Sequence, residues 1–322
     1  SVITWGAPFS GGDSSSVSSQ LNSGVKEIFS NSSAFAALKA DGSVVTWGVD
    51  AIGGNSNHVA NKLKSSVISI SSTTTAFAAI KEDGSVVTWG EGDDYEKSIY
   101  PDSGRNAGGD SSDVEDKLKS GVKEVFSNYS AFAALKEDGS VVTWGDPLLT
   151  GGSYGTSNLI PQIDEGVVDI FSTSGSFAAL KKDGSVITFG DSIRGGDSSE
   201  VADKLSNGVI DIVAGRHAYA ALKEDGSVVT WGLGGLWGGD QSGLSSVKKI
   251  YATDMAFAAV KEDGSLFTWG NQDQGGGITK SIDEIGGNIV DIVGNSGGFV
   301  VIKDDGTAFT LGNAGNHLTS PL

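Results

Sequence analysis

The stretch from Ala131 to Gly145 reads Ala-Phe-Ala-Ala-Leu-Lys-Glu-Asp-Gly-Ser-Val-Val-Thr-Trp-Gly, and close copies of it occur seven times in the 322-residue chain. Each copy contains an Asp-Gly pair, and successive pairs are 42, 55, 45, 42, 38 and 42 residues apart. The pairs begin at Asp41, Asp83, Asp138, Asp183, Asp225, Asp263 and Asp305. A period near 42 residues, made of short apolar runs, is typical of a radial β-repeat rather than of seven separate domains.

One repeat, from Gly24 to Gly48, contains three strand patterns. Residues 25–30 alternate imperfectly, and residues 34–39 are apolar on both faces, as expected for a strand buried between two sheets. The Asp41-Gly42 pair then indicates a hairpin, because it tolerates the positive φ angles of primed turns. Residues 44–47 are rich in β-branched and aromatic side chains. We therefore predict one three-stranded sheet per repeat.

The last strand of each repeat carries a large side chain at a fixed position. A strand-borne Trp at a repeated position is usually a packing element, so we predict that these side chains form the core between neighbouring sheets. The predicted core residues are Trp5, Trp47, Trp89, Trp144, Phe189, Trp231 and Trp269, with Leu311 at the same position of the last copy.

The linkers between repeats begin with Gly-Gly-Asp-Ser-Ser or related turn sequences. In Val17/Leu21 and its relatives, two apolar residues lie four apart, which predicts a short helical turn over the sheet edge; an extended fourth strand is the alternative. Ser1 to Gly6 repeats the last-strand motif. We predict that residues 1–6 close the last sheet, with a leftover of a preceding repeat as the alternative.

The repeat from Val209 to Gly232 resembles that of the regulator of chromosome condensation family. The matching residues are Ala214-Gly215, Ala221-Leu222, Asp225-Gly226, Val228 and Trp231-Gly232. The resemblance implies an all-β fold, a seven-bladed β-propeller with mainly three-stranded blades, that spans residues 1–322 as one domain. A bacterial relative of this family is the propeller-type β-lactamase inhibitor.

The family's His, four residues before the Leu, is absent from every copy. Its positions hold Ala34, Ala76, Ala131, Ser176, Ala218, Ala256 and Gly298. The family's guanine nucleotide exchange and chromatin binding therefore do not transfer to this chain by residue, and fold alone does not imply function.

Composition excludes several kinds of partner and site. The formal net charge of −18 makes nucleic acid and anionic membrane surfaces poor partners. No apolar run is long enough to span a bilayer, so we expect no membrane insertion. The chain has no Cys, which rules out disulfides, thiolate metal sites and a Cys nucleophile.

Sequence motifs for catalysis or cofactor binding are missing. His58, His217 and His317 show no metal-ligand spacing, and we interpret His217, beside Arg216, as solvated or capping. The acidic loop at Asp93-Asp94 supplies only part of a calcium shell. We therefore expect no cofactor, no metal and no enzymatic activity; a propeller lyase or glycosidase is the least favoured hypothesis.

Function is expected where the copies differ, which is in the unusual linkers. Aromatic and Arg side chains on adjacent loops are typical of protein-binding hot spots. The alternative is that these side chains fold back over the sheet edges as lids. The candidate partner-binding residues are Tyr95, Tyr100, Arg105, Leu148, Leu149, Tyr154 and Trp237.

These patterns favour a non-catalytic, structural or interaction module. We expect it to bind another protein or a glycan outside the cell or on its surface, and to be part of a longer repeat protein or a free module. The alternative is a soluble protein inhibitor resembling the β-lactamase inhibitor.

Overall fold

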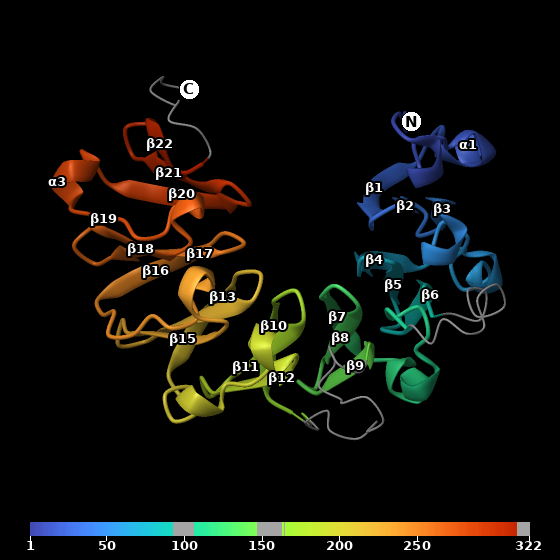
Figure 1. Ribbon diagram of the computed structural model, residues 1–322. Coiled ribbons are helices and arrows are strands. Elements are labelled where there is room, and N and C mark those ends of the chain that lie inside the picture. The colour runs from blue at the N-terminus through green and yellow to red at the C-terminus, as the bar shows by residue number, and fades with distance from the viewer. Residues whose placement is uncertain (93–105, 147–162, 164, 314–322) are drawn as a thin grey trace. The chain divides into compact units, whose positions relative to one another are not determined.

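The computed structural model describes residues 1–92, 106–146, 163 and 165–313 (Figure 1). The chain divides into two compact units, Ser1–Ile170 and Phe171–Leu322. The predicted candidate residues Tyr95, Tyr100, Arg105, Leu148, Leu149 and Tyr154 lie outside the described residues.

Strands of the described residues form seven antiparallel sheets, six of three strands and one of four. In the first unit the sheets are β1 (Val25–Ser30), β2 (Ala34–Lys39) and β3 (Val44–Gly48); β4 (Val67–Ser72), β5 (Ala76–Lys81) and β6 (Val86–Gly90); and β7 (Val122–Ser127), β8 (Ala131–Lys136) and β9 (Val141–Gly145). The unit boundary falls within β10 (Val167–Ser172), which belongs to the sheet of β11 (Ser176–Lys181) and β12 (Val186–Gly190).

The remaining sheets of the second unit follow the same order along the chain. They are β13 (Val209–Ala214), β14 (Ala218–Lys223) and β15 (Val228–Gly232); β16 (Val247–Ala252), β17 (Ala256–Lys261), β18 (Leu266–Gly270) and β19 (Thr279–Lys280); and β20 (Ile289–Asn295), β21 (Gly298–Lys303) and β22 (Ala308–Gly312). These seven sheets confirm the prediction of an all-β, seven-bladed architecture with mainly three strands per blade.

The Asp-Gly turns have the chemistry that the sequence predicted. In the first sheet, the backbone N–H and the hydroxyl of Ser43 both donate to Asp41 Oδ1, at 3.0 and 2.6 Å. Gly42 has a φ of 76°, a conformation that is sterically unfavourable for any residue with a side chain. The side-chain hydrogen bond from Ser43 lowers the pKa of Asp41, because it stabilises the charged carboxylate. Turn chemistry therefore sets the register of each hairpin.

The linkers contain short helical turns, and one linker also contributes the extended strand β19, so both predicted alternatives occur. The helical segments are η1 (Pro8–Ser10), η2 (Ser15–Val17), α1 (Ser18–Leu21), η3 (Asp50–Ile52), η4 (Asn57–Val59), η5 (Ser112–Leu118), η6 (Ser192–Arg194), η7 (Ser199–Val201), η8 (Gly235–Trp237), η9 (Gln272–Gln274) and α3 (Ile282–Ile285).

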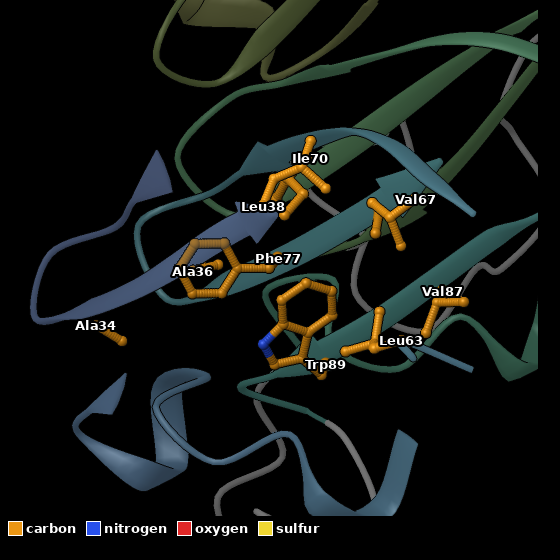
Figure 2. Close-up of a cluster of buried hydrophobic side chains, with 10 residues drawn as sticks. Ala34, Ala36, Leu38, Leu63, Val67, Ile70, Phe77, Val87 and Trp89 are labelled. Atoms are coloured by element: carbon orange, nitrogen blue, oxygen red, sulfur yellow. The ribbon is translucent and has the colours of Figure 1, made fainter. Parts of the chain in front are cut away.

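The core lies between neighbouring sheets. Figure 2 shows one such cluster, in which Phe77 and Trp89 of one sheet pack against Ala34 and its neighbours on strand β2 of the preceding sheet. The indole N–H of Trp89 donates to the carbonyl of Gly53 in the linker, at 3.1 Å. A Cβ at Gly53 would lie 2.6 Å from the Phe77 ring, so the linker needs glycine at this close approach.

Six of the seven predicted core residues are buried. They are Trp47, Trp89, Trp144, Phe189, Trp231 and Trp269. Each stacks on the aromatic residue of its own middle strand, with ring centroids 4.9 to 5.4 Å apart.

Trp5 differs from this pattern, because its side chain is 84% exposed. Residues 1–6 form no strand, although Val2 donates to the Leu21 carbonyl and the hydroxyls of Thr4 and Ser14 share a hydrogen bond of 2.9 Å, as in later repeats. A buried Trp5 depends on the last sheet, which belongs to the other unit, so its burial in the core stays a prediction. Closure of the last sheet by residues 1–6 stays a prediction.

Candidate functional site

Three segments of the second unit bring aromatic and charged side chains together. They are the linker helix η6, the turn from Gly215 to His217 between β13 and β14, and the linker helix η8. The residues concerned are Asp191, Arg194, Arg216, His217 and Trp237, which we call the Trp237 corner. The contacts and charges of this corner make it our candidate functional site.

The aromatic part of the corner is a packed pair of rings. The centroids of the His217 and Trp237 rings are 4.1 Å apart, and the ring planes are inclined by 37°. Gly238 ends η8 in a left-handed conformation with a φ of 80°, and a Cβ at this position would lie 2.8 Å from the Phe257 ring. The linker therefore approaches the sheet closely at the residue that follows Trp237.

The turn that carries His217 differs from its counterpart in the first repeat. There, Asn31 Oδ1 accepts hydrogen bonds from the N–H groups of Ser33 and Ala34, and the Asn31 amide donates to the Ile52 carbonyl. Gly215 occupies the Asn31 position and has no side chain to make these contacts. In this repeat, ring packing takes the place of the amide link between turn and linker.

Hydrogen bonds between neighbouring turns hold Arg216 in place. Its carbonyl accepts from Ser174 N–H at 2.9 Å, and its own N–H donates to the Asp254 carbonyl at 2.6 Å. The backbone is thus bonded on both sides while the Arg216 side chain remains exposed. A rigid backbone with an exposed long side chain is a favourable arrangement for binding.

Arg194 is positioned by its own linker. Asp191 caps η6 by accepting from Ile193 N–H at 2.9 Å, and it forms an ion pair with the Arg194 guanidinium. The Arg194 carbonyl accepts from the hydroxyls of Ser176 and Thr173 at 2.7 and 2.9 Å. The Arg194 side chain is 41% exposed, so part of it remains available to a ligand.

The electrostatic environment of His217 is cationic. Burial lowers the pKa of His217 first, and the charges of Arg194 and Arg216 lower it further, while Asp191 opposes them. His217 Nδ1 is buried and has no hydrogen-bond partner among the described residues. At neutral pH the corner thus presents a neutral imidazole beside two guanidinium groups.

Sequence reasoning identified only one of these residues. Trp237 was a predicted partner-binding residue, and the structure places it half-buried on His217, next to Leu236, which is 61% exposed. Sequence reasoning missed Arg194 and the role of Arg216, and it interpreted His217 as solvated or capping. One usable signal was present, because Arg194 and Arg216 are two of only three arginines in the chain.

Two further observations bear on function. In the part of the chain that the structure describes, no three His, Asp or Glu side chains gather closely enough to hold a metal ion. The same residues include no helix of the length and hydropathy required to cross a membrane.

The seven antiparallel sheets and their repeat motif define the class of protein, which is all-β with the seven-bladed β-propeller architecture that the sequence predicted. No protein-family profile matches the chain, and no curated protein matches it in sequence.

Solved structures of similar fold include Prp20p of Saccharomyces cerevisiae, at 16% identity and a TM-score of 0.47, covering 87% of this chain and 83% of that one. Human WBSCR16 is 17% identical with a TM-score of 0.46, covering 87% and 88%. The CRINKLY WD40 ectodomain of the Arabidopsis thaliana receptor kinase ACR4 is 17% identical with a TM-score of 0.43, covering 89% and 99%. At these identities the likeness concerns the fold alone.

Proposed function

We propose that this chain is a non-catalytic propeller scaffold that binds another protein through the Trp237 corner. The observation that carries the proposal is the packing of Trp237 on His217, whose imidazole feels the charges of Arg194 and Arg216. Trp and Arg are enriched among residues that dominate binding energy in protein interfaces. The sheets of the second unit support the corner, which lies on loops, where binding residues usually occur.

The location of the protein is part of the same proposal. An acidic chain without Cys cannot undergo thiol oxidation, and its high charge favours solubility, which together support an extracellular or cell-surface location. The Trp and Arg side chains of the corner support a protein partner. Among the proteins of similar fold, Prp20 has been solved bound to Kap60, and its binding to Gsp1p and histones is described.

The proposal is tested by affinity capture with the intact chain and two variants. Trp237→Ala removes the aromatic surface of the corner. Ile52→Ala is the matched control, because Ile52 is the last residue of η3 just as Trp237 is the last residue of η8. Circular dichroism and thermal unfolding would establish that both variants fold.

We expect the native chain and Ile52→Ala to capture the same partner in equal amounts. Trp237→Ala should bind that partner about tenfold or more weakly, since hot-spot truncations cost about 2 kcal/mol or more. Equal retention by all three proteins, measured by quantitative mass spectrometry, would show that the corner is not the binding site.

A further inference from the structure

We propose that residues 1–6 form an acceptor site for a β-strand of a partner protein, and that this strand has the small–aromatic–small–small–aliphatic sequence of the chain's own middle strands. The site belongs to the first unit, whereas the Trp237 corner belongs to the second, so the two proposals are independent. Three observations carry the inference: how residues 1–6 are held, which side chains they leave exposed, and how the middle strands are paired.

The linker that follows residues 1–6 holds them in the same way that the next linker holds β3. Val2 N–H donates to the Leu21 carbonyl at 3.1 Å. The corresponding bond from β3 runs from Val44 N–H to the Leu63 carbonyl and measures 3.0 Å. Residues 1–6 therefore have the outer contacts of a third strand, although they belong to no sheet.

The position of a middle strand beside these residues is empty in the first unit. Gly6 and Gly48, which end the two segments, have nearly the same backbone conformation, with φ angles of 111° and 113°. A Cβ at Gly48 would lie 2.7 Å from Ala34 Cα on the middle strand β2. At Gly6, no heavy atom of the described residues lies within 4 Å of the same point.

The side chains that face a middle strand in other repeats are exposed here. Trp5 is 84% exposed, whereas the corresponding Trp47 is 4% exposed and stacks on Phe35 with ring centroids 5.2 Å apart. Ile3 is 79% exposed at the position where β3 has a buried Val. An extended segment with an unpaired edge and exposed apolar side chains is a template for strand addition.

The chain itself shows which sequence fits such a surface. In the cluster of Figure 2, Ala34, Ala36 and Leu38 alternate along β2 and pack against the next sheet. Ile70 on that sheet is 4% exposed, whereas the corresponding Ile28 of the first sheet is 43% exposed. A strand of the same sequence beside residues 1–6 would cover Ile28 with its small residues and place its aromatic ring on Trp5.

The chain has no spare middle strand to supply. All seven middle strands among the described residues are paired on both edges. In the last sheet, β21 pairs with β20 on one edge and with β22 on the other. Pairing of residues 1–6 with β21 would therefore require displacement of β22, and a second folded copy would face the same obstacle. These pairings favour a strand from a different protein.

The probe is a fluorescein-labelled peptide of residues Val122–Lys136, which carries the sequences of β7 and β8. Its binding to the intact chain is followed by fluorescence anisotropy. We expect saturable binding, and about tenfold or more weaker binding by the matched peptide with Phe132→Ala, because that peptide lacks the ring that would lie on Trp5.

Two variants of the chain separate side-chain packing from backbone pairing. Trp5→Ala should weaken binding of the peptide about tenfold or more. Ile3→Pro should weaken it several-fold, because Val2 N–H points to the linker, so the next N–H points to the open edge and proline removes it. Ile68→Ala removes an exposed apolar side chain elsewhere in the first unit and should leave binding unchanged.

Hydrogen exchange of residues 1–6 and thermal unfolding supply readouts that a merely structural role would move differently. We expect fast exchange in the free chain, slower exchange with the peptide, and the same unfolding temperature for Trp5→Ala as for the native chain. Absence of binding, or equal binding by Trp5→Ala and Ile3→Pro, would overturn the proposal.

Two further outcomes would identify another occupant and also overturn it. Slow exchange of residues 1–6 in the free monomer, with a lower unfolding temperature for Trp5→Ala, would show that the last sheet already fills the site. Slow exchange that appears only with dimer formation, measured by sedimentation, would assign the site to a second copy of this chain.

Discussion

Two interfaces between neighbouring sheets use the same position of the repeat differently. In the first unit, Phe77 packs against Ala34 and its neighbours in a wholly apolar cluster (Figure 2). In the second unit, Tyr219 occupies the Phe77 position and faces Ser176, which occupies the Ala34 position. Both aromatic rings are fully buried, so the difference lies in one hydroxyl group on each side of the interface.

The Tyr219 hydroxyl is satisfied by a small polar network. It shares a hydrogen bond of 3.0 Å with the Ser176 hydroxyl and accepts one of 3.1 Å from Thr173 N–H. A buried hydroxyl without a partner would cost about 1–3 kcal/mol. In this interface the two neighbouring repeats have changed together, and the paired Ser176 and Tyr219 hydroxyls distinguish it from the apolar cluster of Phe77.

The largest expected effect comes from removing the apolar contact common to both interfaces. Phe77→Ala should lower the free energy of unfolding by about 3–5 kcal/mol, because it deletes a fully buried ring and leaves a cavity. Urea denaturation would measure this change. Phe35→Ala is the matched control and should cost less, since Phe35 is only half-buried at the same position. Equal losses would mean that burial between sheets does not set the stability of this position.

Exchanging the small residue opposite each ring should have the next largest effect on the free energy of unfolding. Ser176→Ala removes one partner of the buried Tyr219 hydroxyl and should cost about 1–3 kcal/mol. Ala34→Ser is the matched change in the apolar interface, and it should also destabilise, because the new hydroxyl faces Phe77. If Ala34→Ser proves stabilising in urea denaturation, the interface is more polar than the structure shows.

A double-mutant cycle measures the coupling free energy of Ser176 and Tyr219 separately from their contacts with other residues. Ser176→Ala combined with Tyr219→Phe restores an apolar interface like that of Phe77, and it should be within about 1 kcal/mol of the native chain, because both partners are replaced together. The coupling free energy between the two changes should be about 0.5–3 kcal/mol. Strict additivity would show that the shared hydrogen bond contributes nothing measurable.

A further effect of the buried Tyr219 appears only at alkaline pH. Burial raises the pKa of Tyr219 to about 12, from 10.0. The protonated hydroxyl therefore favours the folded state, and this contribution is fully present below pH 10 and is lost as the pH rises to about 12. The free energy of unfolding of the native chain should fall relative to Tyr219→Phe over this range. Parallel curves for the two proteins would contradict a buried, neutral Tyr219.

Most of the fold was predictable because its signals are local. Middle strands such as β8 are apolar on both faces, and Asp138-Gly139 supplies a hairpin turn in the same repeat, so strand and turn could be placed without knowledge of distant contacts. The buried Trp144 position followed from repetition. Trp5 shows the limit of that reasoning, because the same motif recurs at residues 1–6 without forming a strand or burying its Trp side chain.

The candidate site was predictable only in part. Trp237 was identifiable as the single Trp outside the repeated strand position. Its contact with His217, and the nearby charge of Arg194, join residues 20 and 43 positions away in the chain, from a turn and another linker. Nothing in the local pattern of any of these segments indicates the other two.

The repeat, the three-stranded sheets, the Asp-Gly turns and the large residues of the core could all be inferred from the amino-acid sequence, since each depends on residues close together in the chain. Three features became apparent from the tertiary structure alone: Ser176 satisfies the Tyr219 hydroxyl, His217 packs on Trp237, and the charge of Arg194 acts on His217. The physical reason is that burial, hydrogen-bond partners and the field of neighbouring charges depend on which repeats become neighbours in space.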